Sequence, residues 1–369
     1  MLGCVQNNET YLISNTYNTE IKIKDTLSFI SIPIDSLSEL SYQKNFVLKE
    51  GKIEYLYGFN PRRHSFDVFD LNNKKFIKHI KLNRDGPNSI SRVYKFLVHS
   101  SDSIIIMDAL SLKIINGNGE VKNKISLDIE GIPNIPDGHF LNYNDASLIY
   151  FPEREELIAH FIPKSLLGKI GNYEDAPLLG SINLETEKVK IFPVSYSKLI
   201  VDRKGKVDER MPNISYANGN IIYGFPVESN IYTYDLAKDT FEEFGGKSKF
   251  SDNIENFDRK EEETFRHTGT WFNSVNYDER NNIFYRTHWG SQDLKLDDMT
   301  YSTSYTKPGY VMFFDLDFNV IEEVKIDDKL WLESSFKYSE GIGFWVKDKY
   351  LEDEDILKIG LYEYEVEQK

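Results

Sequence analysis

The chain repeats one phrase with variation, and this repetition constrains its fold more than any other feature. In each copy an apolar strand runs into Asp-Leu or Asn-Leu, a short polar turn follows, and a second strand begins. The Asp or Asn side chain can accept hydrogen bonds from the turning backbone, and the flanking period-2 apolar pattern is typical of a β-hairpin. Clear copies occur at 66–82, 179–194, 230–244 and 310–326, with Asp70, Asn183, Asp235 and Asp315 at the turns. Recurrence of this kind indicates stacked supersecondary units.

A second class of hairpin precedes each of these, and the two classes together predict six units. These first hairpins lie at 45–59, 95–107, 140–151, 213–225, 272–286 and 336–346. Segment 111–127 is a degenerate second hairpin, and the sixth unit has only one further strand, at 357–367. We expect residues 20–32 to supply its outer strand and close the ring, which removes a free edge. The predicted fold is an all-β, six-bladed β-propeller of four-stranded antiparallel blades, with a seven-bladed ring or a solenoid as alternatives.

Composition limits the classes of partner. No interdomain linker is visible in the 369 residues, so we expect one propeller domain over 20–369. The net charge of −15 disfavours nucleic acid, because neutralising phosphates needs a basic face. The sequence has no apolar run of about 18 residues, so it predicts no membrane-spanning helix.

The single cysteine, Cys4, lies near the start of the chain and has no second cysteine for an internal disulfide. Met1-Leu2-Gly3-Cys4 and the polar residues after it look like the end of a bacterial lipoprotein signal, in which a small residue precedes the lipidated cysteine. We therefore expect residues 1–19 to be a lipid anchor and tether. The alternative is an incidental N-terminal thiol.

Loop lengths predict which face of the ring carries function. The turns inside both hairpin classes are short, whereas the connections between hairpins are long and emerge on one face, which we call the long-loop face. Loops on a rigid scaffold commonly carry binding residues. The connections lie at 83–94, 128–139, 152–178, 195–212, 245–271 and 287–309.

Arginines are concentrated in the connections on the long-loop face. Of the eleven arginines, Arg286 ends a strand that leads to this face and only Arg280 lies on the other side. A planar guanidinium suits carboxylate, sulfate or phosphate, so this bias predicts an anionic ligand. The alternative is pairing with acidic residues of the same loops, such as Asp252 and Glu261 to Glu263. Nine arginines are assigned to this face, two in the short segment between the first two hairpins and seven in the long connections: Arg62, Arg63, Arg84, Arg92, Arg154, Arg203, Arg210, Arg259 and Arg266.

We expect ten side chains from different blades to converge around the mouth of the central channel and bind the ligand. Aromatic residues of the fifth blade add rings that can stack on sugars, although core packing is the commoner role of such residues. The predicted ligand-binding residues are Arg62, Arg63, His64, Arg84, Arg210, Arg266, His267, Arg286, His288 and Trp289. The further aromatic residues are Trp271, Phe272, Tyr285, Tyr301 and Tyr305.

Signals for catalysis are absent from the sequence. The histidines have no metal-ligand spacing, and neither an EF-hand loop, a G-x-S-x-G elbow nor a P-loop occurs. We therefore expect no metal and no cofactor. Propeller enzymes assemble sites from single residues on different blades, so an enzyme remains an open alternative.

Several phrases resemble a group of six-bladed β-propeller lipoproteins of Bacteroidetes, a domain family of unknown function akin to NHL-type and TolB-like propellers. Asp85-Gly86-Pro87-Asn88, followed by Phe96 and Asp102-Ser103-Ile104, looks like the phrase that joins its blades, and Cys4 matches its lipid anchor. The resemblance implies the fold and a location in the cell envelope, at the outer membrane. It carries over no catalytic residue.

Together these observations predict a monomeric, lipid-anchored propeller that binds an anionic small molecule, glycan or protein partner on its long-loop face. Its membrane contact would be through the lipid alone. Two alternatives are a propeller enzyme, such as a glycan lyase or a lactone or ester hydrolase, with its site at the channel mouth, and a structural scaffold of an envelope complex.

Overall fold

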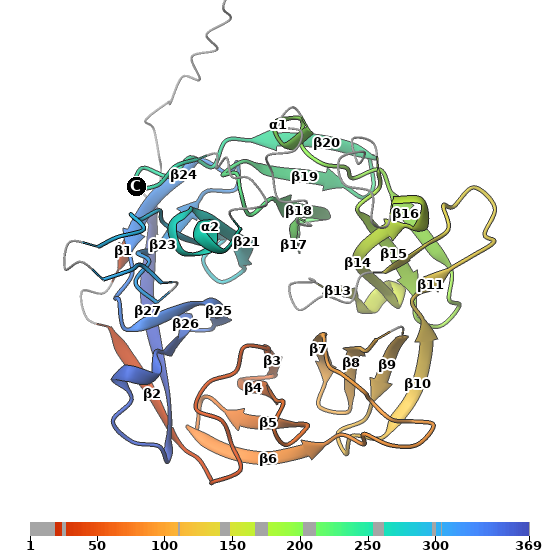
Figure 1. Cartoon of the computed structure of the whole chain (residues 1–369), viewed down its shortest axis with the longest axis horizontal. Coiled ribbons are helices and arrows are strands. Elements are labelled where there is room, and N and C mark those ends of the chain that lie inside the picture. Colours follow the sequence, from red (N-terminus) through yellow and green to blue (C-terminus); the bar gives the residue numbers. More distant parts are fainter. Residues whose placement is uncertain are drawn as a thin grey trace, which may run out of the picture.

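The computed structural model describes residues 19–23, 27–109, 111–140, 148–166, 176–201, 212–253, 262–296, 300–303 and 305–368. Six antiparallel sheets surround a central axis, and Figure 1 shows them as the blades of a ring. Each blade runs from an inner strand beside the axis to an outer strand at the rim. The predicted six-bladed, all-β propeller is confirmed.

Four blades are plain four-stranded sheets whose strands follow the order of the chain. The first blade contains β3 (Asn45–Glu50), β4 (Ile53–Asn60), β5 (Ser65–Asp70) and β6 (Lys75–Lys81). The second contains β7 (Lys95–Ser100), β8 (Ser103–Met107), β9 (Ser111–Ile115) and β10 (Val121–Ser126). The fourth contains β17 (Asn213–Ala217), β18 (Asn220–Gly224), β19 (Ile231–Asp235) and β20 (Thr240–Phe244). The fifth contains β21 (Trp271–Asp278), β22 (Ile283–Trp289), β23 (Gly309–Phe314) and β24 (Val320–Lys325).

The sixth blade closes the ring with strands from both ends of the chain. It contains β25 (Leu330–Tyr338), β26 (Gly341–Val346) and β27 (Ile356–Gln368). Two N-terminal strands, β1 (Thr19–Ile23) and β2 (Ser28–Pro33), pair antiparallel with successive parts of β27. The expected closure is therefore confirmed, and the outer edge is covered by two short strands in place of the single one that we expected.

The third blade differs from the prediction. Residues 140–151 do not form its first hairpin, because β13 (Leu148–Phe151) pairs with β14 (Glu156–Pro163). The sequence pattern predicted a long connection where β14 lies. The turn between these strands consists of η1 (Pro152–Arg154) and Glu155, which has a left-handed conformation with φ 49°. The charged sequence of this turn resembles that of a long loop, so the pattern did not indicate a hairpin. Arg154 consequently lies on the face opposite the long-loop face.

The other strands of the third blade extend the sheet on both sides of β14. β14 also pairs with β12 (Gly138–Phe140) and with β15 (Leu179–Asn183). Beyond these, β11 (Asp128–Ile129) pairs with β12, and β16 (Val189–Phe192) pairs with β15. The short helix η2 (Lys164–Leu166) follows β14 in the chain.

The repeated Asp and Asn residues hold the hairpin turns as the sequence predicts. Asp70 Oδ1 accepts a hydrogen bond of 2.9 Å from the Asn73 backbone, and Asn183 Oδ1 accepts one of 2.7 Å from the Thr186 backbone. Asp235 and Asp315 cap their turns in the same way. Local turn chemistry thus explains the clear copies of the phrase in the first, third, fourth and fifth blades.

The apolar core lies between adjacent blades. One cluster joins Tyr57 and Phe66 of the first blade to Phe96 and Ile104 of the second, and all four side chains are buried. The antiparallel order within each blade places the connections between its second and third strands, and those between blades, together on the long-loop face. Among the described residues, the short helices in such connections are η2, α1 (Lys198–Val201), α2 (Glu262–Thr268) and η4 (Asp348–Tyr350). In the described part of the chain no helix has the length and apolarity needed to span a membrane.

Candidate functional site

Part of the predicted ligand-binding set does come together, above the first blade. Arg62, Arg63 and His64 lie in the turn between β4 and β5, and Arg84 lies in the connection from β6 to β7. Arg84 Nη2 donates a hydrogen bond of 3.2 Å to the carbonyl oxygen of Pro61, so the two segments touch. We call Arg62, Arg63 and Arg84, whose side chains are exposed, the arginine cluster.

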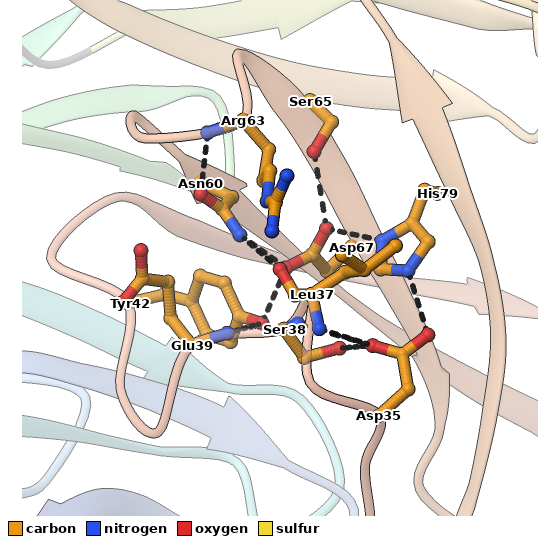
Figure 2. A network of polar contacts seen from close by, with 10 residues as sticks. All are labelled: Asp35, Leu37, Ser38, Glu39, Tyr42, Asn60, Arg63, Ser65, Asp67 and His79. Carbon is orange, nitrogen blue, oxygen red and sulfur yellow. Dashed lines mark hydrogen bonds and ion pairs between the residues drawn. The ribbon is translucent and has the colours of Figure 1, made fainter.

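A buried carboxylate, Asp67, organises the polar residues beneath this turn. Asp67 has no exposed surface and accepts four hydrogen bonds, as Figure 2 shows. Tyr42 Oη donates at 2.6 Å and Asn60 Nδ2 at 3.1 Å to one oxygen. Ser65 Oγ at 3.2 Å and His79 Nδ1 at 2.8 Å donate to the other. Because all of these donors are partly or wholly buried, the network fixes the geometry of the turn.

His79 bridges two carboxylates in this network. Its Nε2 lies 3.0 Å from Asp35 Oδ2, while Nδ1 bonds Asp67. Carboxylate oxygens only accept, so both ring nitrogens carry protons and the ring is an imidazolium. Burial lowers the pKa of His79, but the hydrogen bonds to Asp67 and Asp35 outweigh burial and raise it. The pKa of Asp35, which burial alone would raise, is held below its usual value by His79 and by the Leu37 backbone.

The network determines how the arginines are presented. Asn60 Oδ1 accepts a hydrogen bond of 3.0 Å from the Arg63 backbone. His64 adopts a left-handed conformation with φ 56°, is buried, and its Nε2 hydrogen-bonds the carbonyl oxygen of Ile90 at 2.7 Å. His64 therefore anchors the turn, and the two arginines before it project outward. The Arg62 side chain is 84% exposed, with Nε 3.4 Å from Glu39 Oε1.

A second buried group fixes the connection that carries Arg84. Asp108 accepts hydrogen bonds from Ser91 Oγ at 2.7 Å and from the Arg92 backbone at 2.9 Å. Lys113 Nζ binds both Asp108 and the carbonyl oxygen of Ser89. Burial would raise the pKa of Asp108, but the bonds from Lys113 and Ser91 outweigh it and lower the pKa. A buried carboxylate therefore stabilises each of the two segments that carry the arginine cluster: Asp67 at the β4–β5 turn and Asp108 at the β6–β7 connection.

The arginine cluster is locally cationic in an acidic protein. Segments 61–64 and 83–94 contain four arginines and one carboxylate, Asp85, whereas the whole chain has a net charge of −15. The fourth arginine, Arg92, lies with its guanidinium 4.7 Å from the centroid of the Tyr94 ring. Such a local excess attracts anions even when the net charge of the protein repels them.

Arg286, in contrast, has no exposed surface. Its Nε donates to the carbonyl oxygen of Asn273 and its Nη1 to that of Ser229, each at 2.8 Å. Its guanidinium lies 4.6 Å from the centroid of the Phe272 ring. Burial lowers the pKa of Arg286 to about 9, which leaves it charged at neutral pH. Arg286 therefore joins the fifth blade to the 225–230 turn of the fourth, and a ligand on the surface does not reach it in this structure.

His288 is also fully buried. Its Nε2 lies 2.8 Å from Glu323 Oε1, which also accepts a hydrogen bond of 2.6 Å from Ser248 Oγ. Burial lowers the pKa of His288; for Glu323, hydrogen bonds from His288, Ser248 and the Lys249 backbone outweigh burial and lower the pKa. We infer a neutral imidazole that donates to an ionised carboxylate. This pair ties the 245–253 connection to the blade.

The exposed aromatic rings near the fifth blade are not the predicted residues His288 and Trp289 but rings that pack over them. The Tyr310 ring stacks on His288, and the exposed ring of Phe250 stacks on Tyr310 at 5.1 Å between centroids. Trp289 is 4% exposed and contacts Trp331, on which the exposed ring of Tyr305 packs. His288 and Trp289 thus support exposed aromatic rings without being exposed themselves.

For the remaining predicted residues, the described part of the structure records no side-chain contact with the arginine cluster or with the exposed aromatic rings of the fifth blade. His267 is partly buried on α2, and its carbonyl oxygen accepts a hydrogen bond of 2.7 Å from Gln292 Nε2. Arg210 and Cys4, together with the side chain of Arg266, lie outside the described residues. The described residues contain no group of three His, Cys, Asp or Glu side chains that could hold a metal ion.

Sequence reasoning missed Glu228, which lies in the 225–230 turn and is 1% exposed. Its Oε2 accepts a hydrogen bond of 3.0 Å from Ser197 Oγ, and within the described residues Oε1 has no hydrogen-bond partner. Burial raises the pKa of Glu228 to about 7, although Tyr232, Ser197 and Arg286 act against this rise. A glutamate in a polar turn carries no sequence signal of burial, so only the packing of neighbouring connections reveals it.

Comparison with known proteins identifies the family. A family model described as a domain of unknown function, DUF4221, matches residues 10–325. The chain belongs to the DUF4221 family. The resemblance to a Bacteroidetes propeller family of unknown function is thereby confirmed for the fold, and no curated protein matches the chain in sequence.

Solved structures agree with this assignment. A DUF4221 member from Bacteroides vulgatus superposes with a TM-score of 0.76 at 18% identity, covering 94% of this chain and 99% of the other. A Bacteroides fragilis structure, described as a "Putative exported protein", gives a TM-score of 0.56 at 11% identity and covers 93% and 95% of the two chains. At these identities the likeness concerns the fold alone, so the function of this DUF4221 protein has to be argued from its own residues.

Proposed function

We propose that this DUF4221 protein is a binding propeller of the cell envelope whose arginine cluster holds an anionic group of its ligand. The observation that carries the proposal is the exposure of Arg62, Arg63 and Arg84 on two touching segments. These segments are pre-organised by buried residues, so binding costs little ordering of the backbone.

Guanidinium groups recognise carboxylate, sulfate and phosphate through charge-assisted, often bidentate, hydrogen bonds. Each such bond contributes about 1.5 to 3 kcal/mol when its donor would otherwise face water. Among the described residues, the ion pair recorded for Arg62 is with Glu39, through Nε at 3.4 Å, and the Arg62 side chain remains largely exposed. The geometry therefore suits an external anion better than an internal salt bridge.

The envelope location rests on separate support. The structural relative from Bacteroides fragilis is described as a "Putative exported protein". In bacterial lipoproteins a small residue precedes the cysteine that is lipidated, and Gly3-Cys4 fits this pattern. We propose that Cys4 is acylated and that several acyl chains anchor the protein stably. Mass spectrometry of Cys4 in native protein tests this, and a free thiol on protein from the soluble fraction contradicts it.

Charge reversal at the arginine cluster tests the binding function. We expect the wild-type chain to be retained on heparin, which is sulfated, or on polygalacturonate, which carries carboxylates. The double variant Arg63→Glu/Arg84→Glu should elute at clearly lower salt and bind at least tenfold more weakly, since it loses two charge-assisted contacts.

The matched control is Arg154→Glu, which reverses an exposed arginine in the β13–β14 turn on the opposite face. If Arg154→Glu weakens retention as much as the double variant does, binding reflects overall charge and the proposed site is wrong. Absence of wild-type retention on both polymers and on an acidic peptide column contradicts an anionic ligand altogether.

A further inference from the structure

Two exposed tyrosines occupy the long connection between β22 and β23. Tyr301 is 71% exposed, the highest value for any large apolar or aromatic side chain in the described residues, and Tyr305 is 54% exposed. We call these two residues the tyrosine platform. Neither belongs to the buried clusters of the fifth and sixth blades.

The described parts of the connection that carries the tyrosine platform are held by hydrogen bonds. Lys295 and Tyr301 form an isolated β-bridge, and the Ser302 backbone donates to the Leu294 carbonyl oxygen at 2.9 Å. Gln292 Nε2 donates to the carbonyl oxygens of His267 and Thr303 at 2.7 and 3.0 Å. The backbone is therefore fixed against α2 and against itself, which presents Tyr301 in a defined place.

Tyr305 is supported by a row of rings. Its centroid lies 4.8 Å from that of Trp331, which lies 5.8 Å from that of Trp289. Buried Lys347 donates from Nζ to the Tyr305 carbonyl oxygen at 2.8 Å and lies 5.9 Å from the Trp289 centroid. The Tyr305 ring is packed from below while about half of its surface remains open to solvent. A tyrosine held in this way offers a large contact area and loses little conformational entropy on binding.

The surroundings of the tyrosine platform indicate the chemistry of its ligand. Asp293, Thr300, Thr303 and Thr306 are exposed on the same connection, so the rings stand among hydroxyl and carboxylate groups. Leu294 of this connection is 45% exposed as well, but exposed polar residues accompany it, whereas an apolar protein partner requires a contiguous apolar patch. A sugar ring has apolar C–H faces and polar hydroxyl edges, and it matches aromatic faces that are surrounded by hydrogen-bonding groups.

We infer that the tyrosine platform binds sugar residues, which makes the ligand of this propeller a glycan. The inference rests on the proposed function, because it names the class of molecule whose anionic groups the arginine cluster would hold. Both groups lie in connections between the second and third strands of their blades or between blades, and therefore on the same face. A polymer of several sugars, unlike a single anion, can contact both.

Affinity electrophoresis of the full chain through laminarin, which is uncharged, and through polygalacturonate and heparin tests the inference. We expect the wild type to be retarded by at least one polysaccharide. Tyr301→Ala/Tyr305→Ala should weaken that retardation about tenfold, whereas Tyr305→Phe should retain most of it because the ring is kept. The control is Phe241→Ala, which removes a 45% exposed ring that stacks on Tyr234 in the fourth blade.

Different outcomes separate this inference from the proposed function. If the tyrosine double variant binds every retained polysaccharide like the wild type, the tyrosine platform is not a sugar site. If no polysaccharide retards the wild type while an acidic peptide binds through Arg63 and Arg84, the ligand is a peptide and the inference fails although the arginine cluster stands. A concentration-dependent dimer, seen by analytical ultracentrifugation and abolished in the tyrosine variant, would assign the platform to self-association and also overturn the inference.

Discussion

The tops of the first and fifth blades use similar residues in opposite ways. Above the first blade, the buried carboxylate of Asp67 organises the network beneath a turn whose Arg62 and Arg63 are exposed. Above the fifth blade, Arg286 is itself buried and binds carbonyl oxygens, while His288 pairs with a buried carboxylate. The comparison teaches that an arginine near the long-loop face stays exposed or becomes a structural joint according to what covers it.

The largest effect that tests this contrast is expected at Arg286. Arg286→Met removes the donors to Asn273 and Ser229 and leaves buried carbonyl oxygens without partners, so we expect a loss of about 3 to 5 kcal/mol in the free energy of unfolding. Chemical denaturation followed by circular dichroism measures it. The control Arg154→Met should cost less than about 0.5 kcal/mol. Equal losses for the two variants would remove the distinction between a buried joint and a surface arginine.

Glu228 gives the next effect and a definite pH dependence. Its pKa rises from 4.5 to about 7 on folding, so the folded protein favours the neutral form. Stability from this group is full below about pH 4.5 and falls as pH rises toward 7, by about 3 kcal/mol in total. Glu228→Gln should therefore match the wild type at pH 4 and exceed it at pH 8.

Denaturation curves at both pH values measure the difference between Glu228→Gln and the wild type. Glu242→Gln, at an exposed glutamate of β20, should show no such dependence. A Glu228→Gln variant that is equally destabilised at pH 4 and pH 8 would mean that the carboxyl group is ionised throughout, with its charge satisfied by the surrounding groups.

A smaller effect, with the same direction of pH dependence, is expected at His79. The folded-state pKa is raised above 6.5, so the stability from the imidazolium is present below that value and is lost as pH rises through the folded pKa. His79→Gln should cost about 2 kcal/mol at pH 5.5 and less at pH 9. Thermal melts at the two pH values test this, with the exposed His99→Gln as the control. A cost that is independent of pH would contradict a protonated His79 between Asp67 and Asp35.

The smallest effect on stability is expected at Arg63 of the first blade, which we compare with buried Arg286 of the fifth. Arg63→Ala should change the free energy of unfolding by less than about 0.5 kcal/mol, since its side chain is exposed and the network bonds only its backbone. The same denaturation assay measures it. A loss above about 1.5 kcal/mol would show that Arg63, like Arg286, serves the fold, and would weaken the case for the arginine cluster as a binding site.

Local chemistry explains how much of the fold could be predicted. The Asp or Asn at each hairpin turn acts within a few residues, and so does the positive φ of Asn218 and Gly219 in the turn between β17 and β18. Counting such turns yields six blades, and the missing outer strand of the last blade requires the N-terminal closure that β1 and β2 provide. Prediction failed at β14, because the charged turn before it lacks these local signals.

The candidate site was predictable only in outline, since the sequence by itself determined blade order and therefore which connections share a face. Only the tertiary structure decided which side chains on that face are free. Asp35, Asp67 and His79 meet because β2, β5 and β6 become neighbours, and Arg286 and His288 are covered by connections distant in sequence. The physical reason is that turn chemistry depends on adjacent residues, whereas burial depends on packing between segments whose contacts no local pattern encodes.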